Sequence, residues 1–134
     1  MVTVIDASVA IKWFVREEGF ERAMEILKEL LSTPKKFAVP ELFYFELVNV
    51  FNRLIPAPSK TQEELLAAII NIGINRFSMT SELAAETKNI QRLGLSGYDG
   101  AYLALAKLLK GRWVTFDQEA HNAISHLGLS ECLF

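Results

Sequence analysis

Four acidic residues hold positions from which their carboxylates can meet in a folded chain. Asp6 directly follows the β-branched run at 2–5, and Asp117 directly follows the strand-like segment at 113–116. In an open parallel sheet, functional side chains gather in the crevice beyond the carboxyl ends of the strands. Glu46 and Asp99 lie in two segments of helical pattern. Four carboxylates in one crevice repel unless a cation joins them. Their oxygens suit hard ions, so the set predicts a site for Mg²⁺ or Mn²⁺.

Helix capping is the competing interpretation for the two aspartates at strand ends. Aspartate is a favoured N-cap residue, and both Asp6 and Asp117 precede expected helices. For Asp6, the nearby Ser8 is available as the cap, which leaves the carboxylate for another role. For Asp117, capping and metal binding both stay open.

Glu46 lies on a segment, 41–55, that is apolar nearly all round, so we expect a central helix with a buried carboxylate. Only Glu46, Asn49 and Arg53 form a polar stripe, because spacings of three and four residues share a helix face. A buried carboxylate costs several kcal/mol unless a cation or another partner meets it. The alternative is a contact of Glu46 with Arg53 or Asn49 at a solvent edge.

Asp99 is explained almost as well by its own helix as by a metal. It lies three residues after Ser96, which is the spacing of a capping box, and an acid in the first turn is favourable against the helix dipole. The small residues Gly97, Gly100 and Ala101 indicate a helix packed closely against its neighbours. Asp99 is therefore a candidate metal ligand only when it is considered together with Asp6, Glu46 and Asp117.

The elements that must position these acids alternate along the chain. We expect strands at 2–5, 36–39 and 113–116, with a candidate last strand at 131–134. Seven helices are expected: after Ser8, at 20–32, at 40–55, at 65–74, at 82–93, from Ser96 to Gly111, and after Asp117 up to Gly128. Pro40 suits the first turn of the third of these helices, and Thr61 with Glu64 forms a capping box ahead of the fourth. Strands separated by helices predict an α/β fold, a three-layer α/β/α sandwich with a central, mainly parallel sheet, in a single domain over 1–134.

Composition narrows the class of protein. The chain has 134 residues, of which 51% are hydrophobic and 22% charged, so it should fold around a real core. A net charge of −2 argues against binding nucleic acid through a large positive field, and any such substrate must be held locally. We find no signal peptide and no membrane-spanning segment, which predicts a cytoplasmic protein. Cys132 is the only cysteine, so no intrachain disulfide is expected.

Four segments, in order, resemble the motifs of a known family. VIDASVAIKW (4–13), PELFYFELVNVFNRL (40–54), GLSGYDGAYLALA (94–106) and VTFD (114–117) are similar to the successive motifs of PIN domains of the VapC toxin type. EEGFERAMEIL (17–27), between the first two motifs, is also similar to that group's usual sequence. The resemblance spans the chain except about residues 56–80 and the last few, and it implies a PIN-like fold.

Position by position, the resemblance implies a complete set of site residues. The family's catalytic, metal-binding acids fall on Asp6, Glu46, Asp99 and Asp117. Its supporting polar residues fall on Ser8, Asn49 and Thr115. Gly100 stands where alanine is commoner, which is a change of one small residue for another.

The resemblance also implies an activity and partners. It implies a Mg²⁺- or Mn²⁺-dependent ribonuclease, a hydrolase of RNA phosphodiester bonds, that acts as the toxin of a VapBC-type toxin–antitoxin system. A VapB-like antitoxin would bind a groove near Trp13, Phe14 and Phe20, although aromatic residues in helices are commonly core. A homodimer is implied as well.

Two other classes of protein remain as alternatives, together with a PIN nuclease that is not a toxin. A PIN-like RNA-binding or scaffold module would keep the crevice without cleaving, but the intact acids argue against it. A receiver domain would need adjacent acids after the first strand, whereas Ala7 and Ser8 follow Asp6. His121 and His126 need no catalytic role. If they rim the crevice, Lys12, Arg16 and Arg53 could contact RNA phosphates.

Overall fold

A five-stranded, all-parallel sheet forms the centre of the computed structural model, which describes residues 1–134. In spatial order its strands are β3 (Asn75–Phe77), β2 (Phe37–Pro40), β1 (Thr3–Ile5), β4 (Arg112–Thr115) and β5 (Ser130–Cys132). The strands of the middle of the sheet are short apolar runs, as expected where helices cover both faces. The α/β class and the last strand are confirmed.

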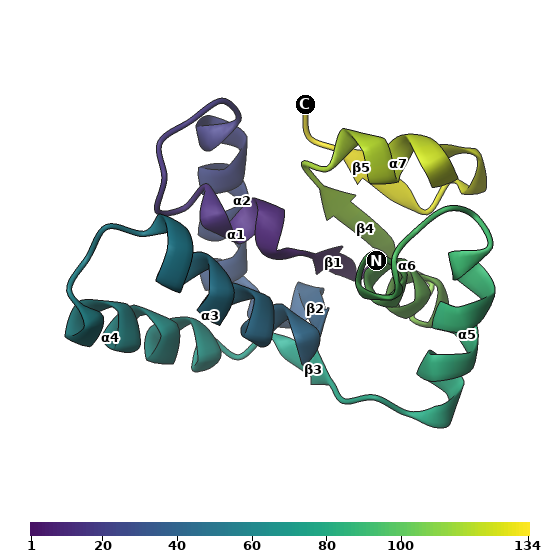
Figure 1. Cartoon of the computed structure of the whole chain (residues 1–134), viewed down its shortest axis with the longest axis horizontal. Coiled ribbons are helices and arrows are strands. Elements are labelled where there is room, and N and C mark those ends of the chain that lie inside the picture. The colour runs from purple at the N-terminus through teal and green to yellow at the C-terminus, as the bar shows by residue number, and fades with distance from the viewer.

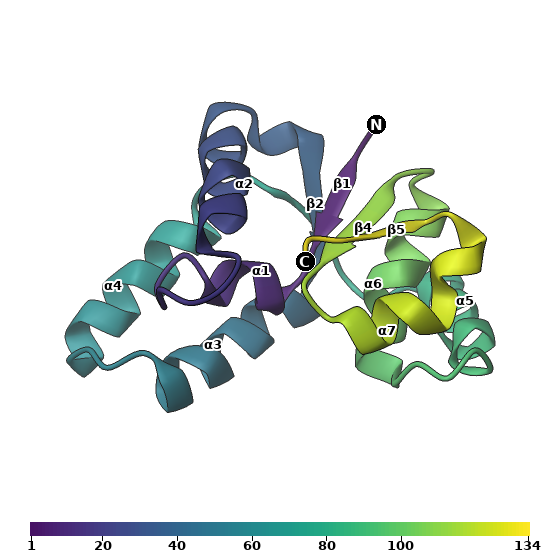
Figure 2. The same cartoon turned by 90° about the horizontal axis from the view of Figure 1, so that it is seen from above.

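Seven α-helices cover the two faces of the sheet. One side carries α1 (Ala7–Ile11), α2 (Phe20–Ser32), α3 (Leu42–Leu54) and α4 (Ser59–Ile70), and the other carries α5 (Ser81–Gln91), α6 (Gly97–Leu108) and α7 (Gln118–Ile124) (Figure 1; Figure 2). Two short 3₁₀ helices, η1 (Pro34–Lys36) and η2 (Ser125–Leu127), complete the chain. This is the predicted three-layer α/β/α sandwich. None of the helices is long and apolar enough to cross a membrane.

The core is one continuous cluster of 33 buried residues. Its largest fully buried side chains are Trp113, Tyr102 and Phe37. Helix α6 is the most deeply buried helix, because every residue from Gly100 to Ala106 is covered. Its small residues allow close packing, and a Cβ added at Gly100 would already touch Thr87 of α5 at 3.4 Å. The expected tight packing around Asp99 is therefore present.

The strand order reverses at β1. The chain runs from β1 outward to β2 and β3 and then returns to β4 on the other side of β1, so Val4 is level with Ala38 in β2 and with Trp113 in β4. In open α/β sheets, the crevice at such a switch point holds the ligand. The residues that follow β1 and β4 are therefore placed at one edge.

The structure differs from the sequence-based expectations in one unexpected strand and in the starts of two helices. Strand β3 was not expected, because its three residues include the charged Arg76 and carry no β-branched side chain. Pro40 ends β2 instead of entering the next helix, and Glu41 is the N-cap of α3. Helix α4 begins at Ser59 with Pro58 as its N-cap, so the capping box at Thr61 does not form.

Helix α3 is not buried all round. Its core face carries Phe43, Leu47 and Phe51, whereas Phe45 and Val48 are exposed. The expectation of a wholly central helix was wrong, because α3 packs against α1, α4 and β2 and leaves its remaining positions exposed. Its exposed residues are partly apolar and partly polar: Phe45, Val48, Asn49, Asn52, Arg53 and Leu54.

Candidate active site

Asp6 is nearly buried at the carboxyl end of β1, where it caps α1. Its Oδ1 accepts hydrogen bonds from the backbone N–H of Ser8, at 2.9 Å, and from the Ser8 hydroxyl. The expectation that Ser8 would be the cap was wrong, because the aspartate itself has the extended backbone and the acceptor that the N-cap position needs. Its other oxygen, Oδ2, accepts a hydrogen bond of 2.9 Å from Nε1 of Trp113.

Burial dominates the electrostatics of Asp6. It raises the pKa of the carboxyl group, while hydrogen bonds from Ser8, Thr115 and Trp113 lower it by less. The donors that surround Asp6 therefore compensate only part of the cost of removing the charge from water. A nearby cation would lower the pKa and favour the charged form.

Ser8 and Thr115 join the start of α1 to the end of β4. Their hydroxyl oxygens lie 3.3 Å apart, and Ser8 Oγ accepts the backbone N–H of Phe116 at 3.0 Å. Thr115 is fully buried, and its Oγ1 accepts the backbone N–H of Asp117 at 3.0 Å. The two hydroxyl groups thus fix the backbone of Asp117 relative to that of Asp6.

Asp117 caps α7 and keeps one oxygen free. Its Oδ1 accepts the backbone N–H of Ala120 at 2.9 Å, whereas Oδ2 accepts no hydrogen bond from the protein. The capping interpretation is thus confirmed for Asp117. Capping occupies a single carboxylate oxygen, so it leaves a ligand atom available.

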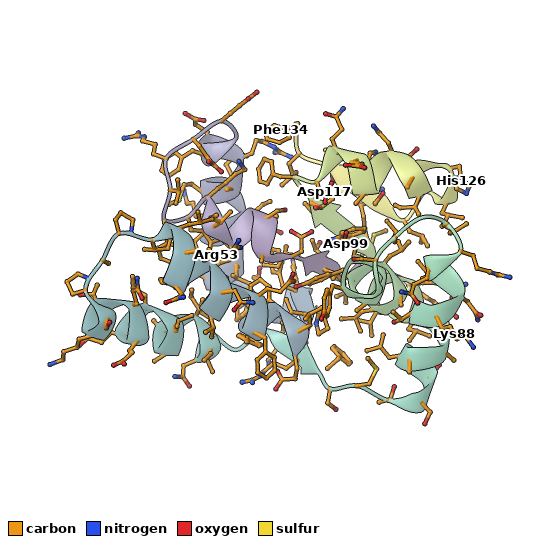
Figure 3. All side chains as sticks on the ribbon, in the orientation of Figure 1. Arg53, Lys88, Asp99, Asp117, His126 and Phe134 are labelled. Carbon is orange, nitrogen blue, oxygen red and sulfur yellow. The ribbon has the colours of Figure 1, made fainter.

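Asp99 and Asp117 line a common cavity of about 300 Å³. Ser96 is the N-cap of α6, and its Oγ accepts the backbone N–H of Asp99 at 3.1 Å, as the capping motif predicted. Burial raises the pKa of Asp99, and the charges of Asp117 and Asp6 raise it further against a smaller lowering by the Ser96 hydroxyl. Figure 3 shows Asp99 and Asp117 near the centre of the molecule, between the two groups of helices.

Glu46 is half-buried and is held by a residue of α6. The hydroxyl of Tyr102 donates a hydrogen bond to its Oε1, while Oε2 accepts none. Neither Arg53 nor Asn49 bonds to Glu46, so the expected alternative of an intrahelical contact is not formed. Burial raises the pKa of Glu46, the Tyr102 hydroxyl lowers it, and the charges of Asp6 and Asp99 raise it again.

The sequence patterns did not reveal three residues of this site. Tyr102 and Trp113, the donors to Glu46 and Asp6, stack with ring centroids 6.2 Å apart and planes at 11°. Tyr102 follows Asp99 by one helical turn, which was the only available sign that it faces the acids. Glu119, in the first turn of α7, lines the cavity of Asp99 and Asp117, and its spacing of two from Asp117 gave no sign of it.

The four acids share one electrostatic environment without forming a closed cage. The charge of Asp6 raises the pKa of both Glu46 and Asp99, Asp99 also acts on Glu46, and Asp117 acts on Asp99. No group of three or more His, Cys, Asp or Glu side chains is arranged to hold a metal ion by itself. The donors fit a hard ion such as Mg²⁺, which typically keeps several waters and takes one or two carboxylates.

Lys12 is not a free surface cation, contrary to the expectation that it could contact phosphate. Its ammonium group lies 2.9 Å from Glu17 Oε1 and 2.8 Å from the carbonyl oxygen of Glu18. It also lies 4.7 Å from the centroid of the Phe116 ring and 5.1 Å from that of Phe134. Lys12 therefore connects the loop after α1 with the aromatic rings of Phe116 and Phe134.

The expected aromatic groove divides into a buried and an accessible part. Trp13 belongs to the core, and its Nε1 donates to the carbonyl oxygen of Ala23 at 2.9 Å. Phe14 packs edge-on against Phe51 and stays partly exposed, as does Phe20. Trp13 is thus unavailable to a partner in this conformation.

The remaining candidates lie outside the acidic crevice. Asn49 and Arg53 are exposed on the outer face of α3, and Arg16 stacks on the ring of Phe20 at 4.9 Å. His121 Nδ1 is 2.7 Å from Ser130 Oγ, which is a structural contact at the edge of β5. Figure 3 shows His126 at the periphery, far from the labelled aspartates.

Comparison with known proteins gives the family and the fold. The model of the PIN domain matches residues 3–125. Among solved structures, a toxin–antitoxin complex from Klebsiella pneumoniae is 16% identical with a TM-score of 0.71, and the match covers 98% of both chains. FitAcB from Neisseria gonorrhoeae is 17% identical with a TM-score of 0.70, over 92% of this chain and 94% of that one.

A third similar structure is Mycobacterium tuberculosis VapC20, described as a toxin that cleaves the sarcin–ricin loop. It is 14% identical with a TM-score of 0.65, over 90% of this chain and 94% of that one. Because all three sequences are at most 17% identical to this chain, these similarities show a shared fold. No curated protein matches by sequence. The family model spans all four acids and the elements that carry them, and the chain belongs to the PIN domain family.

Proposed function

We propose that this protein is a metal-dependent endoribonuclease that hydrolyses RNA phosphodiester bonds, with Asp6, Glu46, Asp99 and Asp117 as its catalytic, metal-binding acids. One observation carries the proposal. Asp99 and Glu46 lie close enough to the other acids that Asp6 and Asp117 raise the pKa of Asp99, and Asp6 and Asp99 raise that of Glu46. Such mutual repulsion costs stability, and a divalent cation would remove it.

The carboxylate oxygens that accept no hydrogen bond indicate which acids can bind the cation. Asp99, Oδ2 of Asp117 and Oε2 of Glu46 have room for a cation or its waters, whereas Asp6 already accepts three hydrogen bonds and offers its remaining lone pair. A bound Mg²⁺ or Mn²⁺ would supply a water of lowered pKa and polarise the scissile phosphate. Glu46, oriented by Tyr102, serves as ligand or as the group that orients the attacking water. Ser8 and Thr115 position the acids.

We further propose that the protein is the toxin of a VapBC-type pair, with a VapB-like antitoxin and a homodimeric state. Solved structures described as toxin–antitoxin complexes share its fold over nearly the whole chain, which supports this role. Phe14 and Phe20, which are partly exposed, would contact the antitoxin in place of Trp13.

The nuclease proposal is tested with purified protein and labelled single-stranded RNA. Cleavage should require Mg²⁺ or Mn²⁺, should stop on addition of EDTA, and should be lost in Asp6→Asn and Asp99→Asn. Glu82→Gln is a matched control, because Glu82 also lies in the first turn of a helix but is exposed on α5. Equal cleavage by the two Asn variants would refute the proposal, and circular dichroism would verify that both fold.

The toxin role needs a separate experiment. Induced expression should slow bacterial growth, and co-expression of a short reading frame directly upstream of the gene should restore it. Absence of growth arrest with a protein that cleaves RNA in vitro would leave a PIN nuclease that is not a toxin.

A further inference from the structure

We propose that the cavity between Phe45 and Tyr98 binds one unpaired nucleobase of the RNA substrate, next to the phosphate that is cleaved. Five residues line this cavity: Leu42, Phe45, Glu46, Asn49 and Tyr98. It belongs to the outer face of α3 and the first turn of α6. The inference rests on the proposed ribonuclease function and names the part of the RNA that this surface recognises.

The two aromatic rings are unusually exposed for their size. Phe45 keeps 69% and Tyr98 68% of their surface open to solvent. Neither ring takes part in the aromatic pairs of the protein, which are Phe14–Phe51, Phe43–Tyr44, Tyr102–Trp113 and Phe116–Phe134. Both rings therefore have a face available, and unpaired bases in RNA are commonly bound by stacking on such faces.

The size of the cavity suits a single planar ring system. Its volume is about 310 Å³, which is enough for one base with room for its ribose and too little for a folded partner. Leu42 adds an apolar side chain to its lining. The Asn49 amide offers both donors and an acceptor, which is the combination needed to bond the edge of a base.

One of the proposed catalytic acids lines the cavity. Glu46 lines it, and the same side chain is bonded to Tyr102 and coupled electrostatically to Asp6 and Asp99. Tyr98 is the residue directly before Asp99 in α6. A base held here would bring the adjoining phosphate to the acids, since one nucleotide links them.

The charge of the cavity favours a base over an anionic group. Its only ionisable acid is Glu46, and no Lys or Arg lines it. A free phosphate or an acidic peptide would meet repulsion there, whereas a neutral base would not. A second copy of the chain is the other occupant that an exposed apolar helix face could accept, and the experiment below separates the two.

The test measures kcat and KM on an RNA that the wild type cleaves. A second substrate has an abasic ribose beside the scissile phosphate. We expect Phe45→Ala and Tyr98→Ala to raise KM for the intact RNA by about 10-fold with little change in kcat, because stacking contributes to binding of the base. The wild type and both variants should have the same, raised KM for the abasic RNA. Tyr98→Phe, which keeps the ring, should recover most of the affinity that Tyr98→Ala loses.

Val48→Ala is the matched control on the same helix. Val48 is 51% exposed on α3 but does not line the cavity, so this variant should behave as the wild type. If the wild type has the same KM for the abasic RNA and the intact RNA, the base site is refuted but the ribonuclease function is not. No cleavage of any RNA by the wild type refutes both. If Phe45→Ala instead converts a dimer to a monomer in light scattering, the surface belongs to a second copy and the proposal fails.

Discussion

Tyr102 and Trp113 stack on each other, and their polar ends donate to two different acids of the site. The rings are 6.2 Å apart at 11°, with the Tyr102 hydroxyl on Glu46 and Nε1 of Trp113 on Asp6. Glu46 belongs to α3 and Asp6 follows β1, so the pair in α6 and β4 connects two acids from different elements. The relative positions of these carboxylates therefore depend on the packing of two buried rings.

Tyr102→Phe should weaken metal binding without unfolding the protein. The change removes only the donor to Glu46, whose pKa the hydroxyl lowers, so Glu46 would bind its proton more tightly and offer its charge less readily. We expect about a 10- to 100-fold loss of Mn²⁺ affinity and of cleavage, the usual effect of removing a partner that orients a ligand. Titration calorimetry measures the affinity. Unchanged affinity would show that Glu46 needs no orientation.

Tyr44→Phe is the matched control and carries its own prediction. The Tyr44 hydroxyl is buried and has no hydrogen-bond partner. Its removal relieves an unsatisfied polar group, so the free energy of unfolding should stay the same or rise by about 1 kcal/mol. Urea denaturation measures it. A clear loss of stability would indicate that this hydroxyl has a partner in solution.

The metal-free protein should lose stability as the pH rises. The pKa values of Asp6, Glu46 and Asp99 are raised above those of an unfolded chain, so the folded state holds more protons from about pH 4 upward to the raised values. Stability falls with pH wherever the folded state binds more protons. Urea unfolding in EDTA should therefore give a larger free energy at about pH 5 than at about pH 8.

Two comparisons check the cause of this pH dependence. Mg²⁺ at about pH 8 should restore the stability that EDTA removes, because a cation that binds only the folded state stabilises it. Asp99→Asn should flatten the dependence in EDTA, since one repelling charge is gone. A stability that increases steadily between the two pH values would contradict the prediction.

Lys12→Met should destabilise the fold without affecting RNA binding. The ammonium group contacts Glu17, the carbonyl of Glu18 and two aromatic rings, and its loss leaves Glu17 half-exposed to water. We expect a loss of about 1–2 kcal/mol in thermal or urea unfolding. The affinity for RNA should remain within about twofold, since Lys12 is buried and its ammonium group already has protein partners. Arg53→Met, at an exposed arginine, is the control for stability.

Gly111→Ala should disrupt the pairing of β1 with β4. A Cβ at Gly111 would collide with the backbone carbonyl oxygen of Val2, which accepts the N–H of Arg112 at 3.1 Å. We expect a loss well above the roughly 1–2 kcal/mol of an ordinary left-handed glycine. Gly128→Ala is the comparison, because Gly128 has φ +68° but open space around it. Equal effects of the two substitutions would contradict the collision.

Two of the acids, Asp6 and Asp117, were predictable from the ends of strands, whereas the hydrogen-bond donors to the acids were not predictable. Asp6 and Asp117 follow β1 and β4, and a parallel sheet brings such positions to one edge. Tyr102 and Trp113 reach the acids across elements distant in sequence, and no spacing rule describes that contact. The position of Glu46 was predicted from the cost of burying it, although its helix proved to be exposed on one face.

The element errors have local causes. Strand β3 has only three residues, and its backbone pairing with β2, as between Arg76 and Val39, defines it more than its side chains do. Pro40 can end the inner strand β2 because the register of β2 with β1 stops at Ala38, so that Pro40 is level with a residue of β3 only. The capping role of Asp6 was considered but given less weight, because Ser8 offered an equally good acceptor in sequence.

The central place of β1 also bears on the order in which the protein is made. β1 is synthesised before both of its neighbours, and one of them, β4 (Arg112–Thr115), follows only after helices α1 to α6. Until then Asp6 lacks Trp113, Thr115 and Asp117, and one side of β1 is an unpaired edge. The acidic crevice is therefore incomplete in a nascent chain that lacks β4.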